Sequence, residues 1–293
     1  YALRNNTIGI QNTAVGRSAL NSNTIGCFNV AVGYHSLLSN TTGNINTAVG
    51  TCTLKANTIG LSNVSIGHTS LYSNTTGSRN IAIGHSALET NTVGQNNVGI
   101  GHYALLANTA SNNTAVGYCA LRSNTTGGAN TSLGFCALTT NTTGSNITAV
   151  GYRALRDNTT GGANIALGVE ALRNNTIGNR NTALGTQTLR DNTASNNTAV
   201  GYHALRYNTT GTYNTAVGCG ALRDNTAGSN NTAVGRFSLV SNTTGFQNTA
   251  LGFNTLLYNS TGNNNTAFGT NALFLNTASN NVAVGFCALR SNT

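Results

Sequence analysis

One short phrase recurs along the whole chain and constrains its fold more than any other feature. It reads Asn-Thr-Ala-Val-Gly-Tyr-Cys-Ala-Leu-Arg-Ser-Asn-Thr-Thr-Gly at residues 113–127, and close variants occur about 17 times. We call the glycine after the Ala-Val pair, here Gly117, the anchor and number the other positions from it. Successive anchors are 17 residues apart, except for three intervals of 16 after Gly101, Gly185 and Gly269. This fixed short period predicts a solenoid or fibre in which each repeat stacks on its predecessor.

A small set of positions is nearly invariant among the repeats. Position −4 is Asn in every copy except at Ile147, position −3 is Thr, Val or Ile, and position −2 is small. Position −1 is Val, Ile or Leu, with Phe268 as the single aromatic, and position +4 is always Leu. An Asn-Thr pair, once Asn259-Ser260, then precedes a second Gly in most copies. Fixed positions among variable neighbours predict that the same sites are buried in every repeat.

The segment from position −4 to the anchor predicts a short β-strand, because it is rich in β-branched residues and bounded by Asn and Gly. One face of this strand carries positions −3 and −1, and the other carries Asn and Ala. Since both faces are constrained, we expect both to be covered. The Ala-Leu pair at positions +3 and +4 is compatible with a second, bent strand or with one helical turn. The Asn-Thr-Thr-Gly segment has the composition of a turn.

Stacking in register explains the invariant columns. At roughly 4.8 Å per coil, the repeats would form a rod about 80 Å long. In-register asparagines can hydrogen-bond along a ladder, as in cross-β stacks, and a buried amide without such partners would cost a few kcal/mol. The predicted ladder residues include Asn113, Asn124, Asn197, Asn208, Leu121, Leu138, Leu155, Leu172 and Leu189.

The composition agrees with one continuous all-β solenoid over residues 1–293. Charged residues make up 6% of the chain, against about a quarter in typical domains. Proline, which would remove a ladder hydrogen bond, is absent. The sequence begins and stops within a repeat, so we expect an interior fragment of a longer protein or ends that meet other subunits. No apolar run approaches the about 18 residues of a membrane span.

The Asn-x-Ala-Val/Ile-Gly segment, followed three positions later by a small residue, resembles the head repeats of trimeric autotransporter adhesins of the YadA type. The Asn-Thr-Ala-Val-Gly-Tyr-x-Ala-Leu arrays also resemble repeats of phage and giant-virus fibre proteins. The similarity covers the whole chain. It implies left-handed parallel β-roll coils, three chains side by side in a homotrimer, and a stalk or binding head at a cell surface. The repeat of this chain is longer than that of the adhesins in the Leu-x-x-Asn-Thr region.

Arginine at position +5 recurs in five successive coils of a chain whose formal net charge is +9. A basic stripe can meet phosphate, sulfated glycan or lipopolysaccharide, or it can keep rods from sticking side by side. The charge is sparse beside that of DNA, which carries one per about 1.7 Å, so we expect no nucleic-acid partner. The stripe consists of Arg156, Arg173, Arg190, Arg206 and Arg223.

Histidine occupies position +1 in three consecutive coils, at His68, His85 and His102. Three imidazoles in one column could hold Zn²⁺ or Ni²⁺. The following coils place Tyr118 and Phe135 at the same position, which favours an exposed variable site instead. We therefore expect no metal and no other cofactor.

The remaining reactive groups carry weak signals. The six cysteines have no metal or redox spacing, and Cys119 and Cys136, which share a position in adjacent coils, are compatible with either a disulfide or free thiols. The five acidic residues form no recognisable catalytic pair, so we expect no enzyme. The repeat itself dictates many Asn-x-Thr/Ser triplets, which could carry glycans in a secretory setting. They include those led by Asn40, Asn74, Asn124, Asn158, Asn208 and Asn242.

These features favour a structural or adhesive extracellular fibre shaft that self-associates on a virion, phage or cell surface. An ice-binding solenoid is the alternative, because Thr columns on a flat β face can order water. Adjacent Thr-Thr pairs point to opposite sides, however, whereas an ice face needs Thr-x-Thr on one side. A module that binds surface glycans through the arginine stripe is a third hypothesis.

Overall fold

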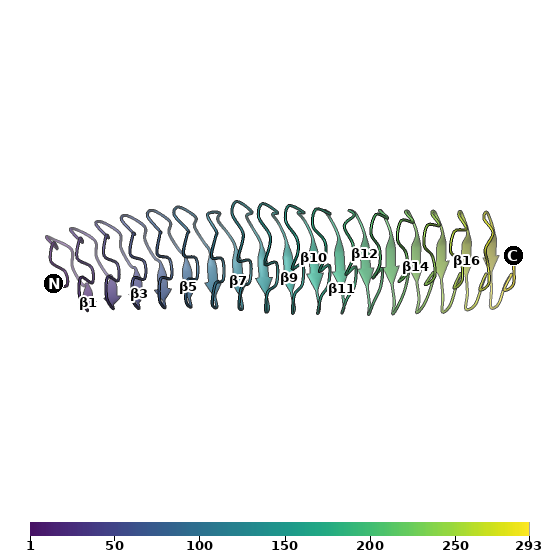
Figure 1. Cartoon of the computed structure of the whole chain (residues 1–293), viewed down its shortest axis with the longest axis horizontal. Coiled ribbons are helices and arrows are strands. Elements are labelled where there is room, and N and C mark those ends of the chain that lie inside the picture. The colour runs from purple at the N-terminus through teal and green to yellow at the C-terminus, as the bar shows by residue number, and fades with distance from the viewer. Residues whose placement is uncertain (293) are drawn as a thin grey trace. The chain divides into compact units, whose positions relative to one another are not determined.

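The regular elements of residues 1–292, the part described by the computed structural model, are 17 β-strands of three residues each (Figure 1). Each strand runs from position −3 to position −1, as the sequence predicts. The strands are β1 (Thr13–Val15), β2 (Val30–Val32), β3 (Thr47–Val49), β4 (Val64–Ile66), β5 (Ile81–Ile83), β6 (Val98–Ile100), β7 (Thr114–Val116), β8 (Thr131–Leu133), β9 (Thr148–Val150), β10 (Ile165–Leu167), β11 (Thr182–Leu184), β12 (Thr198–Val200), β13 (Thr215–Val217), β14 (Thr232–Val234), β15 (Thr249–Leu251), β16 (Thr266–Phe268) and β17 (Val282–Val284).

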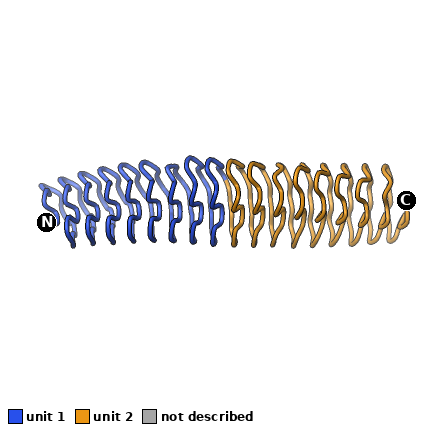
Figure 2. Tube along the Cα trace, viewed as in Figure 1, with its two compact units in different colours: residues 1–146 blue, residues 147–293 orange. Residues whose placement is uncertain are grey.

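The chain divides into two compact units, residues 1–146 with β1–β8 and residues 147–293 with β9–β17 (Figure 2). Within each unit, every strand pairs in parallel with the strand of the next coil. The pairing is in register: Ala115 lies opposite Ser132 in unit 1, and Ala166 lies opposite Ala183 in unit 2. Each unit is therefore an all-β parallel solenoid, which confirms the predicted fold class.

Backbone hydrogen bonds join successive coils outside the strands as well. In unit 1 the Cys119 amide donates to the carbonyl of His102 in the preceding coil at 3.0 Å. Two residues later, the Leu121 amide donates to the carbonyl of Ala137 in the following coil, also at 3.0 Å. In the turn, the Thr125 amide donates to Thr142 at 2.9 Å. Nearly the whole contour of a coil thus contributes to the ladder, although only three residues of it are strand.

The segment from the anchor to the leucine is neither a second strand nor a helical turn, so both sequence-based alternatives for it are wrong. Its φ angle is +135° at Gly117, 54° at Cys119 and 51° at Leu121, and it is not positive at the two residues between them. A left-handed backbone costs a leucine roughly 1–2 kcal/mol. Full burial of the leucine side chain stabilises the coil by about 2 kcal/mol, which offsets that cost.

The invariant leucines from Leu20 to Leu273, which are all 0% exposed, and the small residues fill the interior of their coils. Leu121 and Leu138 of unit 1 are 0% exposed, as are Leu155, Leu172 and Leu189 of unit 2. The alanine or serine at the centre of each strand from β2 to β17 is also buried, as is the glycine of β6. Small residues there leave room for one leucine per coil, so the core is thin and repeats identically.

Two asparagine ladders run beside this apolar core. At position +7, Asn124 Nδ2 donates to Oδ1 of Asn108 in the preceding coil at 2.7 Å and to the carbonyl of Gly127 at 2.8 Å. Asn208 in unit 2 makes the equivalent pair of bonds, at 2.6 Å and 2.8 Å. At position −4, the backbone N–H groups of Asn113 and Asn197 donate to Oδ1 of the preceding asparagine at 2.9 Å and 3.0 Å.

The side chains of Asn113, Asn124, Asn197 and Asn208 are all buried. The ladders therefore supply the partners without which buried amides would destabilise the fold.

The 16-residue coils keep these ladders intact. In the first of them, the carbonyl of Ala110 takes the place of the turn glycine and accepts bonds of 2.9 Å from both Asn97 and Asn108. The carbonyl of Ala194 has the same role in the second, and that of Ala278 in the third. The missing residue is thus absorbed within the turn.

Within a single chain, only one of the two strand faces that we expect to be covered is covered. In every strand the first and third residues are exposed or only half-buried. The reason is that the rest of each coil closes over the Asn/Ala face alone. Among the described residues there is no helix long and apolar enough to cross a membrane.

Candidate functional site

The first and third side chains of the strands form two columns on the open face, which we call the strand ribbon. None of the 17 strands places a charged residue in it, although the chain carries a formal net charge of +9. In unit 1, Val15 is 57% exposed and Leu133 is 46% exposed; in unit 2, Leu167 is 39% exposed and Phe268 is 53% exposed. The ribbon is therefore an uncharged, largely apolar surface that repeats once per coil.

Threonine lines one column of the ribbon in six successive strands of unit 2. Their hydroxyl groups make no hydrogen bond to any group in residues 1–292, so they are available to water or to a partner. The six are Thr182, Thr198, Thr215, Thr232, Thr249 and Thr266.

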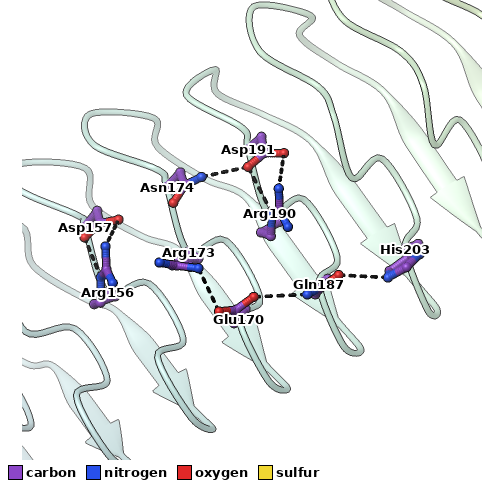
Figure 3. A network of polar contacts seen from close by, with 9 residues as sticks. All are labelled: Arg156, Asp157, Glu170, Arg173, Asn174, Gln187, Arg190, Asp191 and His203. Carbon is purple, nitrogen blue, oxygen red and sulfur yellow. Dashed lines mark hydrogen bonds and ion pairs between the residues drawn. The ribbon is translucent and has the colours of Figure 1, made fainter.

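The arginine stripe lies elsewhere on the coils of unit 2, and three of its five guanidinium groups form ion pairs with the next residue in the chain. Figure 3 shows two of these pairs, Arg156–Asp157 and Arg190–Asp191. Each of these pairs has two nitrogen–oxygen contacts between 2.7 and 3.0 Å, a fork geometry that suits arginine and carboxylate. The pairs are Arg156–Asp157, Arg190–Asp191 and Arg223–Asp224. Hydrogen bonding to the aspartates raises the pKa of both Arg190 and Arg223, so these two guanidinium groups stay ionised.

The fourth arginine belongs to a chain of polar contacts that crosses three coils (Figure 3). Arg173 donates to Glu170 at 2.8 Å, Gln187 Nε2 donates to the other oxygen of Glu170 at 3.0 Å, and Gln187 Oε1 lies 2.9 Å from His203 Nε2. Burial, together with nearby arginines of which Arg206 contributes most, lowers the pKa of His203. The imidazole is thereby held neutral near neutral pH, and on its other side it lies 3.5 Å from Arg206.

Arg206, the fifth arginine, has no carboxylate partner among the described residues. Its guanidinium lies 4.9 Å from the ring centre of Tyr207 and 3.5 Å from His203. Four of the five stripe arginines are thus paired with a carboxylate, which leaves the stripe with a net charge of only +1. This charge balance makes the stripe a poor binding site for a polyanion, because attraction to phosphate or sulfate grows with uncompensated charge.

The three histidines of unit 1 form a stack of parallel rings. Ring centres are 5.2 Å apart for His68 and His85 and 4.8 Å apart for His85 and His102. Tyr118 and Phe135 continue the stack at 5.5 Å and 5.3 Å. Because each ring covers the face of the next, a sugar cannot stack on these faces. No group of three or more metal-binding side chains is found within residues 1–292.

The six cysteines are all free thiols. Cys119 is buried, and burial raises the pKa of its thiol, which keeps it protonated and unreactive at neutral pH.

The fold and these surfaces define a repetitive parallel β-solenoid with an open, uncharged strand face. Comparisons of the chain with protein-family models, with curated proteins and with solved structures found no match.

Sequence reasoning missed the polar chain around Glu170. The signal was present, because Glu170, Gln187 and His203 all occupy position +2 in three consecutive coils. In a solenoid, residues that share a position in adjacent coils are neighbours in space. The sequence places an aspartate directly after three of the stripe arginines, but the effect of these aspartates on the charge of the stripe follows only from the observed geometry.

Proposed function

We propose that the chain is a structural element of an extracellular fibre, in which copies lie side by side with their strand ribbons in contact. The observation that carries this proposal is the ribbon itself: it is exposed, it contains no charged side chain, and it is present in every strand of both units. A soluble chain rarely leaves a long apolar surface open unless it serves for association.

A second copy of the chain is the occupant that fits the ribbon best. The ribbon repeats at the spacing of parallel strands, about 4.8 Å, so only a partner with the same period keeps every side chain in an equivalent contact. Identical chains meet this condition automatically, and closed symmetric assemblies of them are the usual outcome. Three chains around one axis, each presenting its ribbon inward, would bury the whole open face.

The resemblance of the repeat to trimeric adhesin heads and to viral fibre repeats supports the same assembly and a position on a cell or virion surface. A solenoid of stacked coils suits a spacing or display role, since the length of such a stack grows in proportion to the number of repeats.

Sedimentation velocity across a range of protein concentrations tests association. Replacing Val217 and Leu251, two ribbon residues that are each 36% exposed, by Lys would place like charges between chains and shift the protein to monomers. As the control, Lys at Thr210 and Thr244, which are exposed outside the ribbon, leaves the oligomer unchanged. A wild-type protein that stays monomeric at all concentrations would refute the proposal.

Ice binding is a second candidate, and one observation favours it. The six threonine hydroxyls of the ribbon in unit 2 are unbonded and lie in register on parallel strands. Such an array can order water, although each strand offers Thr-x-Val, Thr-x-Leu or Thr-x-Phe rather than Thr-x-Thr. Thermal hysteresis of a concentrated solution tests it, because an ice-binding face depresses the freezing point below the melting point whereas an association face does not.

A further inference from the structure

The chain contains two structurally different classes of Asn-x-Thr/Ser triplet, the acceptor sequence for N-linked glycans. The first class begins at a ladder asparagine, at position +7 or −4, and each of its leading asparagines is at most 1% exposed. Its members are led by Asn40, Asn63, Asn74, Asn124, Asn130, Asn141, Asn158, Asn208, Asn242 and Asn259. The second class begins at position −5, where the chain turns into the strand, and we call its leading residues the corner asparagines.

Ladder asparagines cannot carry a sugar in the folded coil. N-glycosylation replaces one of the two hydrogens on Nδ2, and the ladder uses both of them at Asn124 and Asn242, for example. Asn124 donates to Asn108 and to Gly127 at 2.7 Å and 2.8 Å, and Asn242 donates to Asn225 and Gly245 at 2.8 Å and 2.9 Å. A glycan at these sites would break a buried hydrogen bond and would have no room, since the side chains are 0% exposed.

Corner asparagines meet the opposite conditions. Asn112, Asn146, Asn230 and Asn264 are exposed, and each has a positive φ between 56° and 64° that turns the side chain outward at a bend. Asn264 donates only one amide bond, to Asn280 at 3.2 Å, and a glycosylated amide keeps one N–H that can still make it. The Nδ2 groups of Asn112 and Asn230 donate to no group within residues 1–292.

The exposed corner asparagines occur at every second coil within each unit. Asn112 and Asn146 are 34 residues apart in unit 1, and Asn230 and Asn264 are 34 residues apart in unit 2. Two coils correspond to about 10 Å along the stack, which leaves space between neighbouring sugar chains. In the adjacent coils, Asn96 and Asn280 also sit at the corner, but Val98 and Val282 replace the threonine that an acceptor triplet requires.

We propose that the corner asparagines Asn112, Asn146, Asn230 and Asn264 are N-glycosylation sites and that the ladder triplets are not. The donor is a lipid-linked oligosaccharide diphosphate: C1 of its first sugar forms a bond to Nδ2, the C1–oxygen bond to the diphosphate breaks, and Nδ2 loses one proton. This inference rests on the extracellular location in the proposed function. The result is a row of sugars along one edge of each unit, spaced by two coils.

The triplets led by Asn5 and Asn174 lie at position +6, and that of the half-buried Asn196 lies at the corner. They take no part in the proposal.

The test is secretion of the chain from a eukaryotic cell, followed by enzymatic glycan release in ¹⁸O-labelled water and peptide mass spectrometry. Each occupied asparagine becomes a labelled aspartate. We expect label at the four corner asparagines and none at Asn124 or at the other ladder asparagines. Thr114→Val is the matched variant, because Val occupies the same strand position in β6. It should remove the label at Asn112 alone and leave the thermal midpoint of the deglycosylated protein unchanged.

A folded, secreted protein whose corner asparagines carry no label would overturn the inference, and so would label on ladder asparagines. Sedimentation of the deglycosylated protein reports self-association independently, so a monomer that carries corner glycans contradicts the proposed function but not the glycan sites.

Discussion

We predict that a substitution in the asparagine ladder at Asn225, which is 0% exposed, strongly destabilises the fold. Its Nδ2 donates to Asn208 Oδ1 at 2.7 Å and to the carbonyl of Gly228 at 2.9 Å, while its Oδ1 accepts from Asn242 at 2.8 Å. The change Asn225→Asp keeps the shape of the side chain and its acceptor, but it replaces the donor by an oxygen that faces two other oxygens. The perturbation is therefore confined to two hydrogen bonds and one charge.

The size of the expected loss of stability follows from two acceptors, Asn208 Oδ1 and the carbonyl of Gly228, which lose their hydrogen-bond donor. A buried polar group left unsatisfied costs about 1–3 kcal/mol, so Asn225→Asp should destabilise the fold by about 4 kcal/mol, with a further cost for the buried charge. Burial raises the pKa of the new carboxyl in the folded state above its unfolded value of about 3.9. The stability of the variant is then greatest below that unfolded value and is lost as the pH rises through the folded pKa. The loss of stability relative to the wild type should therefore be larger near pH 7 than near pH 4.

Urea denaturation gives the overall loss, and amide hydrogen exchange locates it, because a defect in a solenoid weakens mainly its own and adjacent coils. The control is Asn230→Asp at an exposed corner, where the change should alter the free energy of unfolding by less than about 0.5 kcal/mol. Equal effects of the two substitutions, or a loss at Asn225 that is independent of pH, would refute the ladder as a source of stability.

Three further predictions concern the anchor, the polar chain and the arginine stripe. Gly201→Ala should cost more than about 2 kcal/mol, because φ is +128° and the new Cβ would lie 2.8 Å from the carbonyl of Gly218. Gly99→Ala, at a strand centre with ordinary φ, should be near neutral in the same thermal melts. His203→Gln should flatten the fall in stability on acidification, because a histidine whose pKa is lowered, here mainly by burial, stabilises the fold only while neutral. Changing all three stripe aspartates to Asn should create retention on a sulfated-polysaccharide column that salt abolishes, whereas the wild-type stripe binds weakly.

The regular parts of the fold were predictable because identical repeats make identical neighbours. Once the period is known, every residue at position +4 must meet another leucine and every residue at position +7 another asparagine, so Leu121 and Asn124 could be placed in buried columns without coordinates. The strand over Thr114–Val116 followed from β-branched residues between Asn and Gly. The local residue pattern and the stacking of repeats both indicate a strand at this position, which is why this strand could be predicted.

The leucine segment could not be predicted, since leucine has no intrinsic preference for positive φ. Leu121 adopts 51°, and in this conformation its side chain lies in the core while its amide donates to Ala137 of the next coil. The polar contacts of Glu170 could be predicted only in part. Arg173 is close to Glu170 in the sequence, but the contact between Glu170 and Gln187 joins two different coils.

The repeat by itself determined that this protein is a stack of coils with short parallel strands, a leucine core and asparagine ladders, because periodic identity dictates which residues meet. The tertiary structure alone decided which strand face stays open, which asparagines keep a free amide hydrogen and how far the arginines are neutralised. These properties depend on where each coil closes on itself, and that closure is set by the competition among backbone strain, leucine burial and hydrogen bonds between coils.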